Sequence, residues 1–184
     1  MIRGQRNPAE RLEVLPLDFS GKSVLDIGCN QGGMLFELSR SIHCGVGIDY
    51  DSRMINAANR MKAFQEVDNC HFYVFDLDRE PFDIIRDFLP EENVDIVFLL
   101  SVCRWIRKWR EVISFCAAIS NLMLFESNGT DEEQYAQIDH LRRVYRRVDR
   151  IREVSADDPV WKDRQLFFCS EPRLNNAISC GTDV

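Results

Sequence analysis

Residues 24–33 read Val-Leu-Asp-Ile-Gly-Cys-Asn-Gln-Gly-Gly. A short apolar segment that holds one acid, Asp26, runs into a glycine-rich turn, and a helical pattern follows. This order predicts a buried strand, a tight turn and a helix, with glycines where a ligand approaches the backbone at the carboxyl edge of a parallel sheet. A glycine-rich turn alone is weak support for a binding site, so further signals are needed from the rest of the chain.

Strand and helix patterns alternate on both sides of this stretch. Apolar runs bounded by turn residues predict strands at residues 23–27, 44–49, 70–75, 94–100 and 121–125. Helical spacing predicts helices at residues 8–15, with Asn7 as N-cap, at 33–41, at 52–64 and from about Lys108. The two runs at 149–154 and 165–169 predict a closing antiparallel hairpin. The whole pattern is typical of an α/β fold, in which a seven-stranded, mostly parallel sheet carries helices on both faces.

Composition limits the class of protein. The 184 residues are 45% hydrophobic and 29% charged, which predicts a single folded domain over residues 1–172 and a polar tail at 173–184. The net charge of −7 disfavours bulk capture of nucleic acid. Seven cysteines without a C-x-x-C pair indicate neither a disulfide framework nor a metal site. Because no signal-peptide core and no membrane-spanning apolar run occur, we expect a cytoplasmic protein without a membrane partner.

Two further acids follow predicted strands. Asp49 ends the second strand, 21 residues after Gly28, and Asp76 ends the third. Because the carboxyl ends of parallel strands meet at one edge, Asp26, Asp49 and Asp76 should surround one ligand. Three carboxylates suit an ammonium group, a ribose diol and an exocyclic amine, and they suit a pyrophosphate badly.

These residues resemble the class I S-adenosylmethionine-dependent methyltransferases, a Rossmann-like family, from Asn7 to about Pro172. Asp26, Gly28 and Gly32 match the family's acid and glycine motif, and Asn30 replaces its middle glycine. The resemblance implies S-adenosylmethionine as cofactor, bound by the following residues: Asp26, Gly28, Asn30 and Gly32 at the methionine moiety, Asp49 at the ribose, Tyr50, Asp76 and the backbone of Leu77 at the adenine, and Ser101. A dinucleotide-binding dehydrogenase is the alternative, but it expects a small residue at position 30 and gives no reason for Asp26 or Asp76.

The methyl acceptor should be recognised by the loops after the fourth and fifth predicted strands. Arg104 and Trp105 follow the fourth strand, and Glu126 and Asn128 follow the fifth. We assign Arg104, Trp105 and Asn128 to acceptor binding, and Arg104 and Glu126 to catalysis. Trp105 and Trp109 could instead be a hydrophobic pair on a buried helix face. No histidine is an obvious general base; an anionic phosphate acceptor needs none, and Glu126 is the candidate base for a neutral hydroxyl.

Shorter resemblances bear on the acceptor. Residues 26–30, 47–55 and 101–106 resemble RNA 5′-phosphate methyl-capping methyltransferases, whereas the opening at 5–11 resembles bacterial methyltransferases that act on glycans or their terminal phosphates. Residues 141–152, predicted as helix, hold six arginines that form either a charged outer face or an anion-binding stripe. The leading hypothesis is O-methylation of a small phosphate-, sugar- or hydroxyl-bearing molecule. The alternatives are an RNA 5′-phosphate methyltransferase and a non-catalytic partner subunit that retains the cofactor fold; the oligomeric state is left open.

Overall fold

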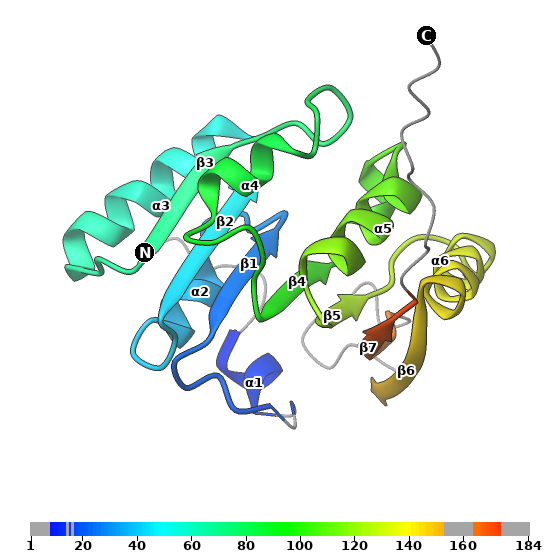
Figure 1. Cartoon of the computed structure of the whole chain (residues 1–184). Helices are drawn as coiled ribbons and strands as arrows, with labels where there is room; N and C mark the ends of the chain where they lie inside the picture. Colours follow the sequence, from blue (N-terminus) through cyan, green and yellow to red (C-terminus); the bar gives the residue numbers. More distant parts are fainter. Residues whose placement is uncertain (1–7, 14, 16, 153–163, 174–184) are drawn as a thin grey trace, which may run out of the picture.

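The computed structural model describes residues 8–13, 15, 17–152 and 164–173, and its strands form a seven-stranded sheet in the order β3-β2-β1-β4-β5-β7-β6 (Figure 1). The strands are β1 Ser23–Ile27, β2 Cys44–Asp49, β3 Cys70–Val74, β4 Ile96–Leu100, β5 Leu122–Glu126, β6 Tyr145–Arg152 and β7 Leu166–Pro172. The first five are parallel, and β7 runs antiparallel to both β5 and β6. The predicted mostly parallel sheet with a closing antiparallel hairpin is confirmed.

Helices cover both faces of this sheet, as predicted (Figure 1). They are α1 Pro8–Leu12, α2 Gly33–Leu38, α3 Ser52–Gln65, α4 Ile84–Phe88, α5 Trp109–Ile119 and α6 Asp131–Val144, with a 3-10 turn at Cys103–Trp105. Alternation along β1 explains the two faces, because successive side chains of a strand point to opposite sides. Leu25 packs in one buried cluster with residues of α4, α5 and α6, and Val24 in a second cluster with residues of α2 and α3.

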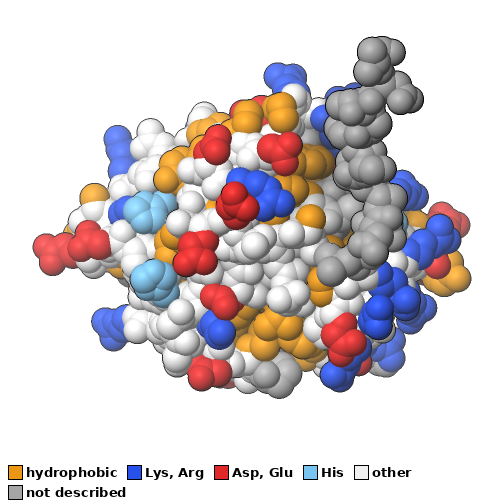
Figure 2. Space-filling view, in the orientation of Figure 1, with side chains coloured by type: hydrophobic (Ala, Val, Ile, Leu, Met, Phe, Trp, Pro, Cys, Tyr) orange, Lys and Arg blue, Asp and Glu red, His pale blue; other side chains and the backbone are white. Residues whose placement is uncertain are grey.

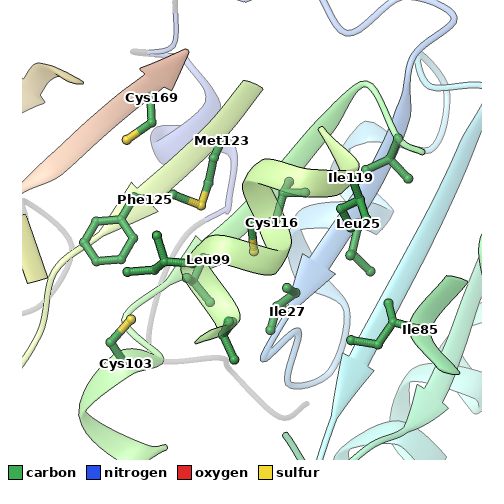
Figure 3. Packing of buried hydrophobic residues seen from close by; sticks show 14 of the residues in the cluster. Leu25, Ile27, Ile85, Leu99, Cys103, Cys116, Ile119, Met123, Phe125 and Cys169 are labelled. Carbon is green, nitrogen blue, oxygen red and sulfur yellow. The ribbon is translucent and has the colours of Figure 1, made fainter. Parts of the chain in front are cut away.

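Figure 3 shows the first of these clusters. Side chains of β1, β4 and β5, among them Ile27, Leu99 and Phe125, pack around Cys116 and Ile119 of α5. All five side chains are at most 1% exposed. Fully buried strands of this kind need apolar residues on both faces, which is why their sequences read as near-continuous apolar runs.

The strand order locates the site. From β1 the chain builds outward through β2 and β3, then returns to the other side of β1 and builds through β4 and β5. The order therefore reverses between β1 and β4. In open parallel sheets, ligands bind beyond the carboxyl ends of the strands at such a reversal. The residues that follow β1 and β4 are thus in the place where a ligand is expected.

One element was predicted wrongly. The sequence suggests a helix through residues 141–152, but strand β6 begins at Tyr145 and pairs with β7 as far as Arg152. Tyr145 is 0% exposed, and Val148 lies opposite the buried Cys169. The hydrogen-bond ladder and this burial outweigh the helix propensity of the arginines.

Several boundaries also differ from the predicted ones. α1 ends at Leu12, α2 ends at Leu38 and β4 begins only at Ile96, and α4 is a helix that the sequence pattern did not indicate. The proposed N-cap Asn7, the residues 153–154 predicted to end a strand, and the tail 174–184 lie outside the described residues. The extent of the domain, residues 1–172, stays a prediction.

Candidate active site

The turn after β1 passes through three left-handed residues: Gly28 (φ 75°), Asn30 (φ 52°) and Gly32 (φ 77°). Asparagine is one of the few residues with a side chain that adopt this conformation readily. Asn30 therefore has the backbone geometry required at the position where the family motif has glycine.

The two glycines make room for protein side chains. A Cβ atom on Gly28 would lie 2.5 Å from Cγ2 of Val102, in the loop after β4, and one on Gly32 would lie 2.4 Å from the Phe72 ring of β3. The sequence analysis explained these glycines by close approach of a ligand. In the structure they let the turn pack against its two neighbours, and this packing sets where the turn lies.

Asp49 connects two turns at the carboxyl edge. Its Oδ2 accepts a hydrogen bond from the Asn30 amide and its Oδ1 accepts one from the Asp51 amide, both at 2.9 Å. A carboxylate has about four acceptor sites, so each oxygen can still accept from a ribose hydroxyl. Tyr50, the next residue, is 74% exposed and presents its ring to solvent.

Asp26 is the most unusual acid of the site. It is 3% exposed, and no hydrogen bond reaches its carboxylate from the described part of the chain. Burial raises the pKa of Asp26 to about 7, an effect that Arg11 opposes and that the nearby Asp49 carboxylate increases. A buried carboxylate without donors is costly. An ammonium group is the kind of ligand that would satisfy it, so Asp26 fits the amino group of S-adenosylmethionine.

Asp76 lies after β3 and bonds within its own turn. Oδ1 of Asp76 accepts a hydrogen bond from the Asp78 amide at 3.0 Å. Oδ2 of Asp76 forms an ion pair with the exposed Arg79, whose Nε lies 3.3 Å away. Leu77 between them is 7% exposed. The Asp78 carboxylate accepts a hydrogen bond from the Arg107 amide at 2.9 Å, so the turn after β3 is connected to the loop after β4.

Asn128 holds the loop after β4 in place. Its amide nitrogen donates to the Ser101 carbonyl at 2.6 Å, and its Oδ1 accepts from the Arg104 amide at 3.0 Å. Asn128 is 2% exposed, and Gln137 of α6 bonds both polar groups of its backbone. Both ends of the side chain predicted to bind acceptor are thus used within the protein. The acceptor contact of Asn128 stays a prediction, whereas its support of Arg104 is observed.

Two arginines near the site were not predicted from the sequence. Nη2 of Arg11, in α1, lies 2.5 Å from Oε2 of Glu126 at the end of β5, and Nη1 of Arg164 donates to Oγ of Ser101 at 3.2 Å. Ser101 Oγ also hydrogen-bonds Glu126 Oε2. Arg11 and Glu126 are 115 residues apart in the chain, so no spacing rule could reveal their contact.

Arg104 and Trp105 are both exposed, Trp105 at 73%. The guanidinium carbon of Arg104 lies 5.8 Å from the centre of the Trp105 ring. The interpretation of Trp105 as half of a buried helical pair with Trp109 is therefore wrong, because Trp105 belongs to the 3-10 turn that precedes α5. An exposed cation beside an exposed aromatic ring forms a surface that can bind a ligand.

A model of the methyltransferase domain matches residues 18–146, which is more than two thirds of the chain. The chain belongs to this methyltransferase family. No curated protein matches it in sequence. As a member of this family the chain is an S-adenosylmethionine-dependent methyltransferase. Two solved structures of the N-terminal domain of EvdMO1, which this chain resembles in fold, contain SAH.

Three solved structures illustrate the likeness of this methyltransferase to known folds. The N-terminal domain of EvdMO1 superposes with a TM-score of 0.71 at 11% identity, over 91% of this chain and 83% of that one. The methyltransferase in complex with the Haloferax volcanii Trm112 activator gives 0.64 at 17% identity, over 93% and 90%. A methyltransferase from Aquifex aeolicus gives 0.61 at 16% identity, over 90% of each chain. Within the described residues, no helix has the length and apolar character to cross a bilayer.

Proposed function

We propose that the methyltransferase methylates an oxygen of a small acceptor that bears a phosphate, a sugar or another hydroxyl group. The observation that carries this proposal is the exposed Arg104 and Trp105 pair in the loop after β4, next to the strand that carries Asp26. Arginine binds phosphate oxygens in a forked geometry, and an aromatic face packs against the apolar side of a sugar ring. The neighbour EvdMO1 was crystallised in the presence of SAH and D-fucose, which also favours a sugar acceptor.

The cofactor side of the proposal follows the roles that the family resemblance implies. S-adenosylmethionine supplies a methyl group on a positively charged sulfur. Asp26 binds its ammonium group, Asp49 its ribose hydroxyls, and the turn that contains Gly28, Asn30 and Gly32 encloses the methionine moiety. At the adenine, Tyr50 flanks the ring, and Asp76 with the Leu77 backbone binds the amine. Ser101, directly after β4, is the last residue that we assign to cofactor binding.

The transfer itself is an in-line displacement, so the protein mainly has to align the acceptor oxygen with the methyl carbon and exclude water. Arg104 contributes to catalysis by holding an anionic acceptor so that its oxygen is aligned with the methyl carbon. A phosphate oxygen is already deprotonated near neutral pH and needs no base. For a neutral hydroxyl, Glu126 is the candidate base, and its bond from Ser101 places its carboxylate beside the end of β4.

Asp49→Ala should weaken cofactor binding by about tenfold to a hundredfold. The variant loses the acceptor atoms for the ribose hydroxyls, and hydrogen bonds to a charged group contribute about 1.5–3 kcal/mol each. Isothermal calorimetry with S-adenosylmethionine measures the effect. Asp68→Ala is the matched control, because Asp68 is an exposed acid just before β3, at the opposite edge of the sheet. An unchanged affinity of the Asp49 variant would refute the ribose assignment.

A screen with methyl-labelled cofactor tests the acceptor. Sugar phosphates, free sugars and an RNA with a 5′ monophosphate are compared, and turnover of a small acceptor is expected. Trp105→Ala and Arg104→Gln should then raise the acceptor KM about tenfold and change cofactor affinity less than twofold. If either variant leaves KM unchanged for every acceptor that turns over, the assignment of this pair fails.

RNA 5′-phosphate methylation is the second candidate, and one observation favours it. Arg142, Arg143, Arg146, Arg147 and Arg150 are all exposed, and Figure 2 shows Lys and Arg side chains gathered at the right, over α6 and β6. Two of them are partly neutralised, since Arg143 pairs with Asp139 and Arg147 with Asp149. Arg146→Gln separates the candidates: it should weaken a salt-dependent RNA interaction and leave the KM of a small acceptor unchanged.

A further inference from the structure

One carboxylate joins the turn after β3 to the far end of the loop after β4. Oδ1 of Asp78 accepts hydrogen bonds from the backbone amides of Arg107 at 2.9 Å and Lys108 at 3.1 Å. Oδ2 of Asp78 accepts from the Arg107 amide at 3.2 Å and lies 3.6 Å from Nε of the Arg107 side chain. The Asp78 side chain is only 18% exposed. Hydrogen bonds to a charged acceptor are stronger than neutral ones, so Asp78 fixes the loop directly before α5 begins.

Asp78 belongs to the same tight turn as the two residues assigned to the adenine. Its own amide donates to Oδ1 of Asp76 at 3.0 Å, and Leu77, between them, packs in the buried cluster that contains residues of α4 and α5. Glu80 closes the turn, because its Oε1 accepts from the Asp76 amide at 2.7 Å and its amide donates to the Asp76 carbonyl at 2.9 Å. These bonds hold the turn as one unit, so a ligand that contacts Asp76 also restrains Asp78.

Asn128 holds the near end of the same loop. The Asn128 side chain bonds the Ser101 carbonyl and the Arg104 amide, and it is buried. The exposed Arg104 and Trp105 lie between this buried contact and the contact with Asp78. One end of the loop is thus fixed inside the protein, whereas the position of the other end depends on the turn after β3.

We propose that Asp78 is a positioning residue that couples the adenine side of the cofactor site to the acceptor surface. Cofactor bound at the turn after β3 restrains Asp78, which then holds the loop that carries Arg104 and Trp105. This inference rests on the proposed adenine role of Asp76 and Leu77. Cofactor binding then favours acceptor binding, and the acceptor favours cofactor binding by the same factor, because coupling between two binding sites is reciprocal.

A carboxylate that only stabilises the start of α5 would hold the loop equally with and without cofactor. A coupling residue instead makes the amides of the loop exchange more slowly with solvent once the cofactor is bound, because amide exchange reports local opening. The Arg104 and Trp105 amides are the informative ones. They donate to Oδ1 of Asn128 and to the Val102 carbonyl, so a change in their exchange does not simply reflect loss of the Asp78 acceptor atoms.

The experiment measures amide hydrogen exchange by NMR with and without saturating SAH, in the absence of any acceptor, for the wild type, Asp78→Ala and Asp78→Asn. In the wild type, SAH should slow exchange of the Arg104 and Trp105 amides by about fivefold or more. In Asp78→Ala the slowing should fall below about twofold, because the loop has lost its contact with the turn. Asp78→Asn keeps an Oδ1 acceptor for both amides and should follow the wild type.

Asp95→Ala is the matched control variant. Asp95 is also a carboxylate that accepts from a backbone amide, that of Ser23 at 2.8 Å, but it lies before β4, at the amino edge of the sheet. This variant should keep the slowing by SAH at the loop amides. The Gly21 amide, bonded to the Ser41 carbonyl at the same amino edge, should change less than about twofold in every protein.

Calorimetry with SAH verifies saturation and checks the cofactor site itself. If Asp76→Ala binds SAH as tightly as the wild type, the adenine assignment fails and the inference fails with it. If Asp76→Ala binds SAH more weakly, but SAH leaves the Trp105 amide unchanged in the wild type or slows it equally in Asp78→Ala, the adenine assignment stands and the coupling is overturned. If urea unfolding shows that Asp78→Ala is not folded, Asp78→Ser replaces it under the same criteria, because the serine hydroxyl is too short to reach both amides.

Discussion

Asp26→Asn is expected to weaken binding of S-adenosylmethionine at least a hundredfold. The substitution removes a buried charge that we propose pairs with the ammonium group, and a charge pair at about 4 Å contributes about 4 kcal/mol at the effective dielectric of a protein site. Calorimetry at pH 7.5 measures the loss. The variant should also lose the pH dependence of affinity between pH 5.5 and 7.5, because the carboxyl group that titrates near 7 is gone. Retention of wild-type affinity would exclude Asp26 from the cofactor site.

The same variant should be more stable than the wild type in the absence of cofactor. The Asp26 carboxyl titrates about three pH units higher in the folded protein than in the unfolded chain, which destabilises the fold by roughly 4 kcal/mol above pH 7. This destabilisation decreases as pH falls and is absent below about pH 4. Burying an unpaired amide offsets part of the gain.

Urea unfolding at pH 7.5 and pH 4.5 tests this. The variant should gain about 2 kcal/mol at pH 7.5 and lose that advantage at pH 4.5. Asp68→Asn, at an exposed site, should change stability little at either pH. If Asp26→Asn is less stable than the wild type by the same amount at both pH values, Asp26 is not held in an unfavourable ionised state.

Gly32→Ala should destabilise the protein by about 3 kcal/mol. Its φ of 77° lies in the left-handed region, which costs an alanine about 1–2 kcal/mol. The added methyl group would also meet the Phe72 ring at 2.4 Å and the Phe36 ring at 3.2 Å. Those rings already pack with centroids 5.2 Å apart, and overpacking a core costs about 1–3 kcal/mol.

Gly21→Ala is a control that the chain itself supplies. Gly21 has a similar φ of 69°, but nothing lies within 4 Å of an added Cβ. Its replacement should cost about 1 kcal/mol, the backbone effect alone. Urea unfolding of both variants measures the difference, which reports how tightly the turn after β1 is packed on β3. Equal losses at the two positions would contradict the packing described for this turn.

The sequence predicted those parts of the fold that depend on local pattern. β1, β2 and the turn between Gly28 and Gly32 follow from apolar runs and glycine spacing, and the parallel strand pattern predicts that Asp26, Asp49 and Asp76 lie at one edge of the sheet. α4 was missed because five residues give too little helical periodicity to recognise. The first part of β6, residues 145–148, was predicted as helix because its arginines are compatible with one, and only pairing with β7 decides otherwise.

The site was predicted less completely, and for a different reason. Arg11 and Arg164 reach Glu126 and Ser101 from distant parts of the chain, and such contacts depend on how the layers pack. Asn128 was predicted to bind the acceptor, but the sequence could not show that both ends of its amide bond to the protein. Local chemistry was readable in the sequence, whereas the connections between loops were not.

The arginines of β6 also affect how copies of the protein meet. β6 is the outermost strand at its margin of the sheet, and Arg146, Arg147 and Arg150 project from it into solvent. If β6 of a second copy paired with this β6, the arginines of the two strands would be brought together and would repel each other. Charged side chains on edge strands commonly prevent such edge-to-edge pairing. Side-by-side polymerisation of the sheet through this margin is therefore electrostatically disfavoured.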